Sequence, residues 1–82
     1  MLKYSVKLFA SLKEKAGYDL WHYESEVVLK ASALLTAFFE QHPNTANLRG
    51  VTRLAVNQSF CSEDLALAAT DELALIPPVS GG

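Results

Sequence analysis

The last seven residues and a few scattered side chains are the groups in this sequence that could do chemistry. Residues 76–82 are IPPVSGG, and none of their side chains is charged. We expect Gly82 to be the true C-terminus, so the terminal carboxylate is the one charge expected in this segment. Gly82 has no side chain to shield its carbonyl, and Gly81 can adopt almost any φ and ψ. A frayed terminus usually carries polar or charged residues, so this uncharged diglycine end raises the question of a chemical role for the main-chain carboxylate. The alternative interpretation is an unstructured terminus.

The side chains offer weaker candidates. Cys61 has neither a CxxC pattern nor a flanking base, so we interpret it as a small apolar residue and not as a nucleophile. His22 and His42 are 20 residues apart, without the spacing of a metal site, and no metal is expected. Four carboxylates are interpreted as solvated strand ends and not as an acid–base pair: Glu24, Glu26, Asp71 and Glu72.

Length and composition favour one small domain. The chain has 82 residues, half of them hydrophobic, which suits a single core. Seven Lys and Arg against nine Asp and Glu give a net charge of −2, which argues against nucleic acid or an anionic membrane as the main partner. The single cysteine excludes an internal disulfide and favours a cytoplasmic protein. The opening MLKYSVKLFA alternates, so neither a signal peptide nor a transmembrane span is expected.

Periodicity predicts short strands around one main helix. Residues 2–10 alternate between apolar and polar types, with Ala10 on the apolar face and Phe9, an exception, on the polar face. Residues 31–42 predict the helix through one apolar stripe, and Pro43 prevents its continuation. The other expected strands span residues 18–28, 51–56, 59–62 and 71–76. The expected connections are a helical turn at 11–16 closed by Gly17, a loop at 44–50, a tight turn at Asn57-Gln58 and a segment with helical tendency at 63–70.

The order strand, strand, helix, strand, short strand, strand predicts an α+β fold, in which a mixed sheet of four or five strands packs on one main helix. The β-grasp, or ubiquitin-like, architecture has this order, with the first and last strands parallel in the middle of the sheet. We expect residues 1–76 to form this domain and 77–82 to form a flexible tail. Pro77 and Pro78 lack the N–H groups that a continuing strand would need.

An apolar patch is expected around the tail root, the point after Ile76 where the tail leaves the sheet. If the first and last strands lie side by side, Phe9 and Ile76 both fall near the strands' C-terminal ends, on the face away from the helix. An exposed apolar patch on a small domain is a candidate partner site. The alternative is that both residues pack under a loop.

Three stretches of the chain resemble the small, sulfur-carrying subunit of molybdopterin synthase: KLFASLKEKAG, AVNQSF and DELALIPPVSGG. The resemblance spans Lys7 to Gly82, and its most specific part is the last stretch. Two positions depart from the family, since Lys13 stands where Arg is frequent and Thr70 where Gly is frequent. Because lysine cannot form the bidentate fork of arginine, one partner contact is expected to be weaker. With Thr70 in place of glycine, we expect a different turn before Asp71 and Glu72.

The resemblance implies a carrier that binds no cofactor itself. An E1-like adenylyltransferase would bind ATP and adenylate the Gly82 carboxylate, since this chain has no phosphate-binding loop. A sulfurtransferase or desulfurase would then supply the sulfur of a thiocarboxylate. The large subunit, which holds most of the active site, would pass this sulfur to cyclic pyranopterin monophosphate, making the molybdopterin dithiolene of molybdenum cofactor biosynthesis. Two carriers on a large-subunit dimer would make a heterotetramer.

The resemblance also implies the roles of individual residues. Gly82 would carry the acyl-adenylate and then the thiocarboxylate. The tail that brings it to the partner would comprise Pro77, Pro78, Val79, Ser80 and Gly81. Phe9, Phe60 and Ile76 would bind the partner through apolar contacts, and Lys13 through an ion pair. From the residues alone, Phe60 could instead fill the core, and Lys13 could be an ordinary solvated lysine.

Three other functions stay open. A sulfur carrier for another pathway, such as thiamin thiazole, tungsten cofactor or amino-acid synthesis, would share the fold and the Gly-Gly end, although thiazole carriers are usually shorter and lack the PPVSGG run. A ubiquitin-like modifier would use the same tail to form isopeptides with lysines. A purely structural binding module would not need Gly81 and Gly82.

Overall fold

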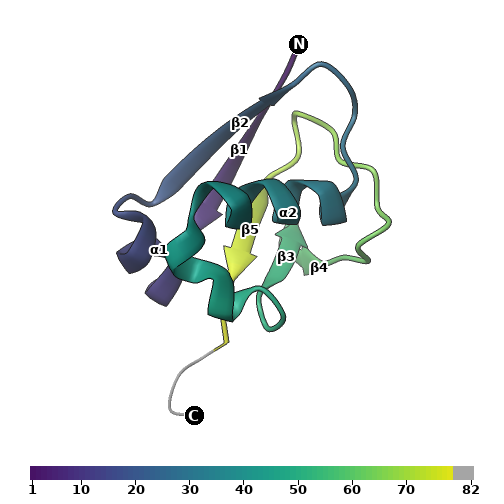
Figure 1. Cartoon of the computed structure of the whole chain (residues 1–82). Helices are drawn as coiled ribbons and strands as arrows, with labels where there is room; N and C mark the ends of the chain where they lie inside the picture. The colour runs from purple at the N-terminus through teal and green to yellow at the C-terminus, as the bar shows by residue number, and fades with distance from the viewer. Residues whose placement is uncertain (79–82) are drawn as a thin grey trace.

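A five-stranded mixed sheet with a helix packed across it forms the domain (Figure 1), and the computed structural model describes residues 1–78. The sheet order is β2-β1-β5-β3-β4, with β1 and β5 parallel in the centre and the other pairs antiparallel. This confirms the predicted β-grasp architecture. The strands are β1 (Leu2–Leu8), β2 (Leu20–Ser25), β3 (Arg53–Val56), β4 (Ser59–Phe60) and β5 (Leu73–Ile76). The helices are α1 (Ala10–Ala16), α2 (Ala31–Gln41) and the 3-10 helix η1 (Pro43–Leu48).

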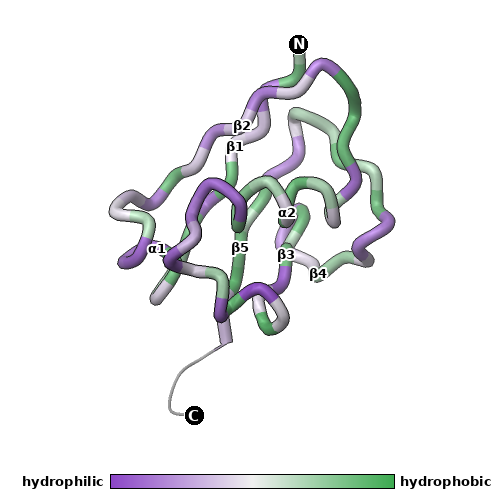
Figure 2. Tube along the Cα trace, in the orientation of Figure 1, coloured by the Kyte–Doolittle hydropathy of each residue, from purple (hydrophilic) through white to green (hydrophobic). Residues whose placement is uncertain are grey.

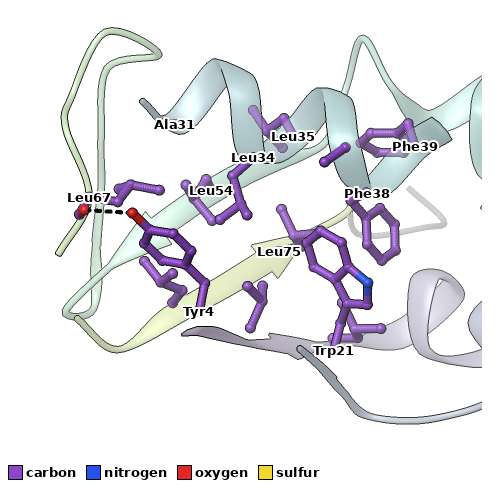
Figure 3. Close-up of a cluster of buried hydrophobic side chains, with 14 of the residues drawn as sticks. Tyr4, Trp21, Ala31, Leu34, Leu35, Phe38, Phe39, Leu54, Leu67 and Leu75 are labelled. Atoms are coloured by element: carbon purple, nitrogen blue, oxygen red, sulfur yellow. Dashed lines mark hydrogen bonds between the residues drawn. The ribbon is translucent and has the colours of Figure 1, made fainter. Parts of the chain in front are cut away.

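The core lies between the inner face of the sheet and α2 (Figure 3). Alternation in β1 places Tyr4 and Val6 on this inner face, where both are fully buried. The buried stripe of α2 faces them, with Phe38 at its centre. Trp21 of β2 packs edge-on against Phe38 at 5.1 Å between ring centroids, and its indole N–H donates to Gln41 Oε1 at 3.0 Å. An aromatic layer therefore closes the β2 side of the core.

The central strand β5 is apolar on both faces, and Figure 2 shows hydrophobic residues along it. Leu73 and Leu75 are buried in the core, and the parallel register sets Leu75 against Leu8 of β1. Ala74 and Ile76 point to the opposite face and are partly covered. The outer face of the sheet is thus apolar where β5 crosses it.

The hydroxyl of Tyr4 joins two loops that cover one end of the core. It donates to the Leu67 carbonyl at 3.1 Å and accepts the Leu29 N–H at 3.1 Å. Residues 63–70 form no helix, so the predicted helical tendency is wrong. Their backbone groups pair instead with the segment before α2, through the bridge between Lys30 and Ala66 and its flanking hydrogen bonds. These tertiary partners replace the local bonds that a helix would need.

The end of β1 differs from the prediction. The strand stops at Leu8, and Phe9 precedes α1 with an extended backbone. Ala10 already belongs to α1, has a positive φ of 50° and is exposed. The expectation that Ala10 lies on the apolar face is therefore wrong, because the chain turns away from the sheet two residues earlier than the alternation indicates.

Other boundaries shift by a few residues. β2 and β4 are shorter than predicted, and the predicted loop at 44–50 contains η1, which Pro43 starts. β3 begins only at Arg53, because the N–H of Thr52 donates to the Leu48 carbonyl at 3.0 Å and extends the preceding turn. The order and pairing of the strands are unaffected.

Two tight turns form as predicted. Gly17 closes α1 with a φ of 87°, and its N–H donates to the Lys13 carbonyl at 3.0 Å. Asn57 and Gln58 join β3 to β4 with φ values of 52° and 72°, the left-handed pair that two-residue hairpin loops require. The Asn57 carboxamide oxygen also accepts the Glu72 N–H at 2.9 Å. This contact ties the hairpin to the start of β5.

Candidate functional site

A shallow groove of about 390 Å³ crosses the outer face of the sheet, on the side away from α2. We call it the outer groove. Because side chains alternate along strands, the outward residues of β1, β5, β3 and β4 meet here. It is lined by Lys7, Phe9, Ala55, Gln58, Phe60, Glu72, Ala74 and Ile76.

The outer groove brings together three residues that the sequence predicts to bind a partner. Phe9 continues the outward alternation of β1 beyond Lys7, and its side chain is 44% exposed. Phe60 is 53% exposed at the opposite wall, so the alternative that it fills the core is wrong. Ile76 ends β5 between them and is partly covered. The prediction that Phe9 and Ile76 share the face away from the helix is confirmed, whereas their partner-binding role stays a prediction.

Charged side chains stand at the edges of this apolar surface. The Lys7 ammonium lies 3.3 Å from a Glu72 carboxylate oxygen, and both side chains are about half exposed. Such an exposed pair contributes at most about 1 kcal/mol to stability, but the two charges neutralise each other. Lys13 is exposed on α1 and lines a neighbouring hollow that shares Phe9 and Lys7 with the outer groove. Its predicted ion pair with a partner stays a prediction.

The chain leaves the sheet at the end of this groove. β5 stops at Ile76, as the two following prolines predict. Pro77 is buried and Pro78 is exposed, so the first proline still packs against the domain. The predictions for Val79, Ser80, Gly81 and Gly82 lie outside the described residues, and the division into a domain and a tail after residue 76 stays a prediction. The segment that carries the proposed reactive end therefore starts beside Ile76 and Phe9.

The Cys61 thiol and the His42 imidazole both make contacts within the domain. Cys61 is partly buried, its Sγ lies 3.7 Å from the Leu54 carbonyl, and burial raises the pKa of this thiol. A raised pKa reduces the reactive thiolate, which agrees with the interpretation of Cys61 as a packing residue. His42 stacks on Phe38, with Nδ1 2.8 Å from the Phe38 carbonyl and Nε2 hydrogen-bonded to the Tyr18 hydroxyl.

Among residues 1–78, His, Cys, Asp and Glu side chains form no group of three that could hold a metal ion. None of the helices formed by these residues has the length and apolar character needed to cross a membrane. The polar lining of the outer groove consists of Lys7, Gln58 and Glu72. The other five lining residues are apolar.

Several residues in or beside the groove were not singled out from the sequence. Ala55 and Ala74 form its floor and face each other in the antiparallel register of β3 and β5. Arg53 lies opposite Ile76 in the same register, and its guanidinium carbon sits 4.0 Å from the centroid of the Phe60 ring. The alternation in residues 51–56 could have placed Arg53 and Ala55 on one face. It could not have shown which strands lie beside them.

Comparisons with known proteins match this architecture along the whole chain. The profile of the ThiS family matches residues 6–82. The molybdopterin synthase sulfur carrier subunit of Dictyostelium discoideum is 34% identical over 83 residues, covering 98% of this chain and 96% of that protein. The crystal structure of SAMP1 from Haloferax volcanii has a TM-score of 0.83 at 31% identity, with 98% and 99% covered. A putative molybdopterin converting factor subunit 1 from Pyrococcus furiosus has a TM-score of 0.84 at 25% identity, with 96% and 100% covered.

These findings confirm the resemblance to the small subunit of molybdopterin synthase that the three sequence stretches indicate. The similarity covers the sheet, the helix α2 and the sequence of the final segment. The solved structures share the ubiquitin-like β-grasp fold. The chain belongs to the ThiS family.

Proposed function

We propose that this chain is the sulfur carrier subunit of molybdopterin synthase and that the C-terminal carboxylate of Gly82 is the carrier group. The observation that carries the proposal is the position of the tail root. The central strand β5 ends at Ile76 beside an apolar groove lined by Phe9, Phe60 and Ile76, and Pro77, the first residue of PPVSGG, follows there. A partner that covers the groove would receive the tail at the same time. The whole-chain similarity to a subunit of that name supports the same assignment.

The chemistry of this proposal takes place on the main chain. An E1-like adenylyltransferase binds ATP, the Gly82 carboxylate oxygen attacks the α-phosphorus, and pyrophosphate leaves. The acyl-adenylate is an electrophile because AMP is a good leaving group. The terminal sulfur of a persulfide on the sulfurtransferase or desulfurase then attacks the carbonyl carbon and displaces AMP, which gives an acyl disulfide. A thiol attacks the donor's sulfur in this acyl disulfide, so that a new disulfide forms on the donor and the thiocarboxylate is left on Gly82. The chain holds no cofactor in this cycle, since the activating partner binds the nucleotide.

Sulfur transfer then takes place in the large subunit. The Gly82 thiocarboxylate sulfur attacks a carbon of cyclic pyranopterin monophosphate, and hydrolysis of the resulting thioester leaves the sulfur on the pterin and returns the Gly82 carboxylate. Two such transfers make the molybdopterin dithiolene. Residues 79–82 can span at most about 13 Å when fully extended, at about 3.3 Å per residue. The large subunit must therefore bind close to the tail root. The outer groove provides that contact through Phe9, Phe60 and Ile76, with Lys13 beside it.

A second candidate function is protein modification. SAMP1 of Haloferax volcanii, called small archaeal modifier protein 1, is similar along nearly its whole length. A modifier would use the same acyl-adenylate, but the acceptor would be a lysine amine of another protein. Conjugates that resist denaturation would distinguish it from a carrier, because an isopeptide bond survives a denaturing gel and a docked complex does not.

The proposal is tested by the intact mass of the chain after incubation with ATP, a sulfur donor and the adenylyltransferase from the same genome. Replacing one carboxylate oxygen by sulfur adds about 16 Da, and alkylation of the product separates this change from oxidation. A variant lacking Gly81 and Gly82 is the matched control. Unmodified wild-type chain, with the adenylyltransferase shown to be active on ATP, would refute the carrier function.

A further inference from the structure

Arg53 lies beside the tail root, and the proposed function assigns it no role. It starts β3 and lies opposite Ile76, the last residue of β5. Leu54 and Val56 point into the core, so Arg53 and Ala55 point to the outer face. Ala55 is part of the outer groove. The exposed Arg53 side chain therefore extends that surface at the end where the chain leaves the sheet.

The guanidinium of Arg53 is held in place by Phe60. Its carbon lies 4.0 Å from the centroid of the Phe60 ring, a cation–π contact between β3 and β4. A guanidinium packed over a ring keeps its N–H groups available at its edges. Such an arginine is arranged for bidentate hydrogen bonds to a carboxylate and loses little side-chain freedom on binding.

The charge of Arg53 is uncompensated in residues 1–78. Lys7 and Glu72 form the one ion pair found among these residues, and Arg53 takes no part in it. Lys13 stands beside Phe9, and Arg53 stands beside Phe60. The outer groove is thus flanked by two cations on a chain whose net charge is −2. A partner that covers an apolar groove with this border needs carboxylates at its own rim, since complementary charges favour the correct docked arrangement.

We infer that Arg53 is a specificity-determining residue for the large subunit, whose Asp or Glu side chain it binds through a bidentate ion pair next to the tail root. The inference rests on the proposed function, because it takes the large subunit as the occupant of the outer groove. Phe60 has two roles in this arrangement. It contacts the partner through its exposed ring and holds the Arg53 guanidinium in position for the carboxylate.

The test is the Kd for the large subunit encoded in the same genome, measured by isothermal titration calorimetry with a series of Arg53 variants. Arg53→Gln removes the charge and should raise Kd about ten- to a hundredfold, as expected for the loss of a charge-assisted hydrogen-bonded pair. Arg53→Lys keeps the charge without the planar fork and should fall between wild type and Arg53→Gln. Arg53→Glu places like charges together and should bind more weakly than Arg53→Gln.

Arg49 provides a matched control. Its guanidinium also lies over an aromatic ring, that of Phe39, at 5.7 Å, but Phe39 belongs to α2 on the opposite side of the sheet. Arg49→Gln removes the same charge and the same type of contact, and it should leave Kd within about twofold of wild type. Raising the salt from about 0.05 to about 0.3 M should weaken wild-type binding more than binding of Arg53→Gln.

The outcomes separate this inference from the proposed function. If wild type binds the large subunit and Arg53→Gln binds equally well, the role of Arg53 is refuted while the carrier function stands. Equal losses in Arg53→Gln and Arg49→Gln would also refute it, since they would reflect net charge alone. Equal losses in Arg53→Gln and Arg53→Glu would indicate lost packing on Phe60 and no partner carboxylate. A wild-type chain that does not bind the large subunit would refute the proposed function and this inference together.

Discussion

Replacing Phe9 by alanine should weaken binding of the large subunit about thirtyfold while the domain stays folded. A phenylalanine side chain buries about 200 Å² when it is fully covered. Phe9 is 44% exposed, so about 90 Å² is left for a partner to cover. At about 25 cal/mol per Å² of apolar surface, this area contributes about 2 kcal/mol of binding free energy, or about thirtyfold in Kd.

The same substitution also removes the part of the ring that already packs against the domain. That loss should lower the free energy of unfolding by about 1–2 kcal/mol, as is common for a half-covered side chain. A domain with about 5–15 kcal/mol of stability remains folded after such a loss. Calorimetric titration with the large subunit gives Kd, and thermal melting followed by circular dichroism gives the stability of each variant.

Val28→Ala is the control for this measurement. Val28 is 59% exposed and lies in the loop between β2 and α2, beyond the end of the sheet opposite to Phe9 (Figure 1). Its Kd should stay within about twofold of wild type, because an exposed apolar residue outside the interface contributes little to binding. If Phe9→Ala binds as wild type does but melts at a clearly lower temperature, Phe9 is a packing residue and the interface assignment is wrong.

Two further substitutions or reactions test the structure itself. Tyr4→Phe removes a buried hydroxyl that bonds to the backbone of Leu67 and Leu29. Urea unfolding should show that the free energy of unfolding falls by about 1–3 kcal/mol, because two backbone groups lose their partner. An unchanged unfolding midpoint would show that these bonds are not formed. Burial raises the pKa of the Cys61 thiol, so less thiolate is present at a given pH than on an unfolded chain. Alkylation at pH 8 should be slower in the native protein than in urea, with the native rate rising as the pH increases; equal rates in both states would contradict the buried position of the thiol.

Local patterns in the sequence were sufficient for most of the fold. The period-two alternation of β1 and the apolar stripe of α2 are properties of a few neighbouring residues, so they can be recognised before any contact is known. The same holds for Gly17 at the end of α1 and for Asn57 in the hairpin turn, because each adopts a backbone conformation that few other residues tolerate. The two prolines that end β5 act through their missing N–H groups.

The predictions that failed concern segments whose conformation depends on distant partners. Residues 63–70 have a helical composition, but Tyr4 and the bridge to Lys30 hold them in an irregular, non-helical conformation. Ala10 follows the alternation of β1, yet the chain has already turned into α1. In both cases the contacts made by the folded chain outweigh a weak local preference.

The candidate site shows the same division. The sequence was enough to indicate a tail with a diglycine end, because composition is a local property. It also indicated that Phe9 is an apolar residue on the otherwise polar face of the first strand, because alternation is local too. It could not reveal the outer groove, because the groove exists only where β5 lies between β1 and β3. Nor could it reveal the stacking of Arg53 on Phe60 beside Ile76, which depends on the pairing register of three strands. A change of one residue in that register would turn these side chains to the other face of the sheet.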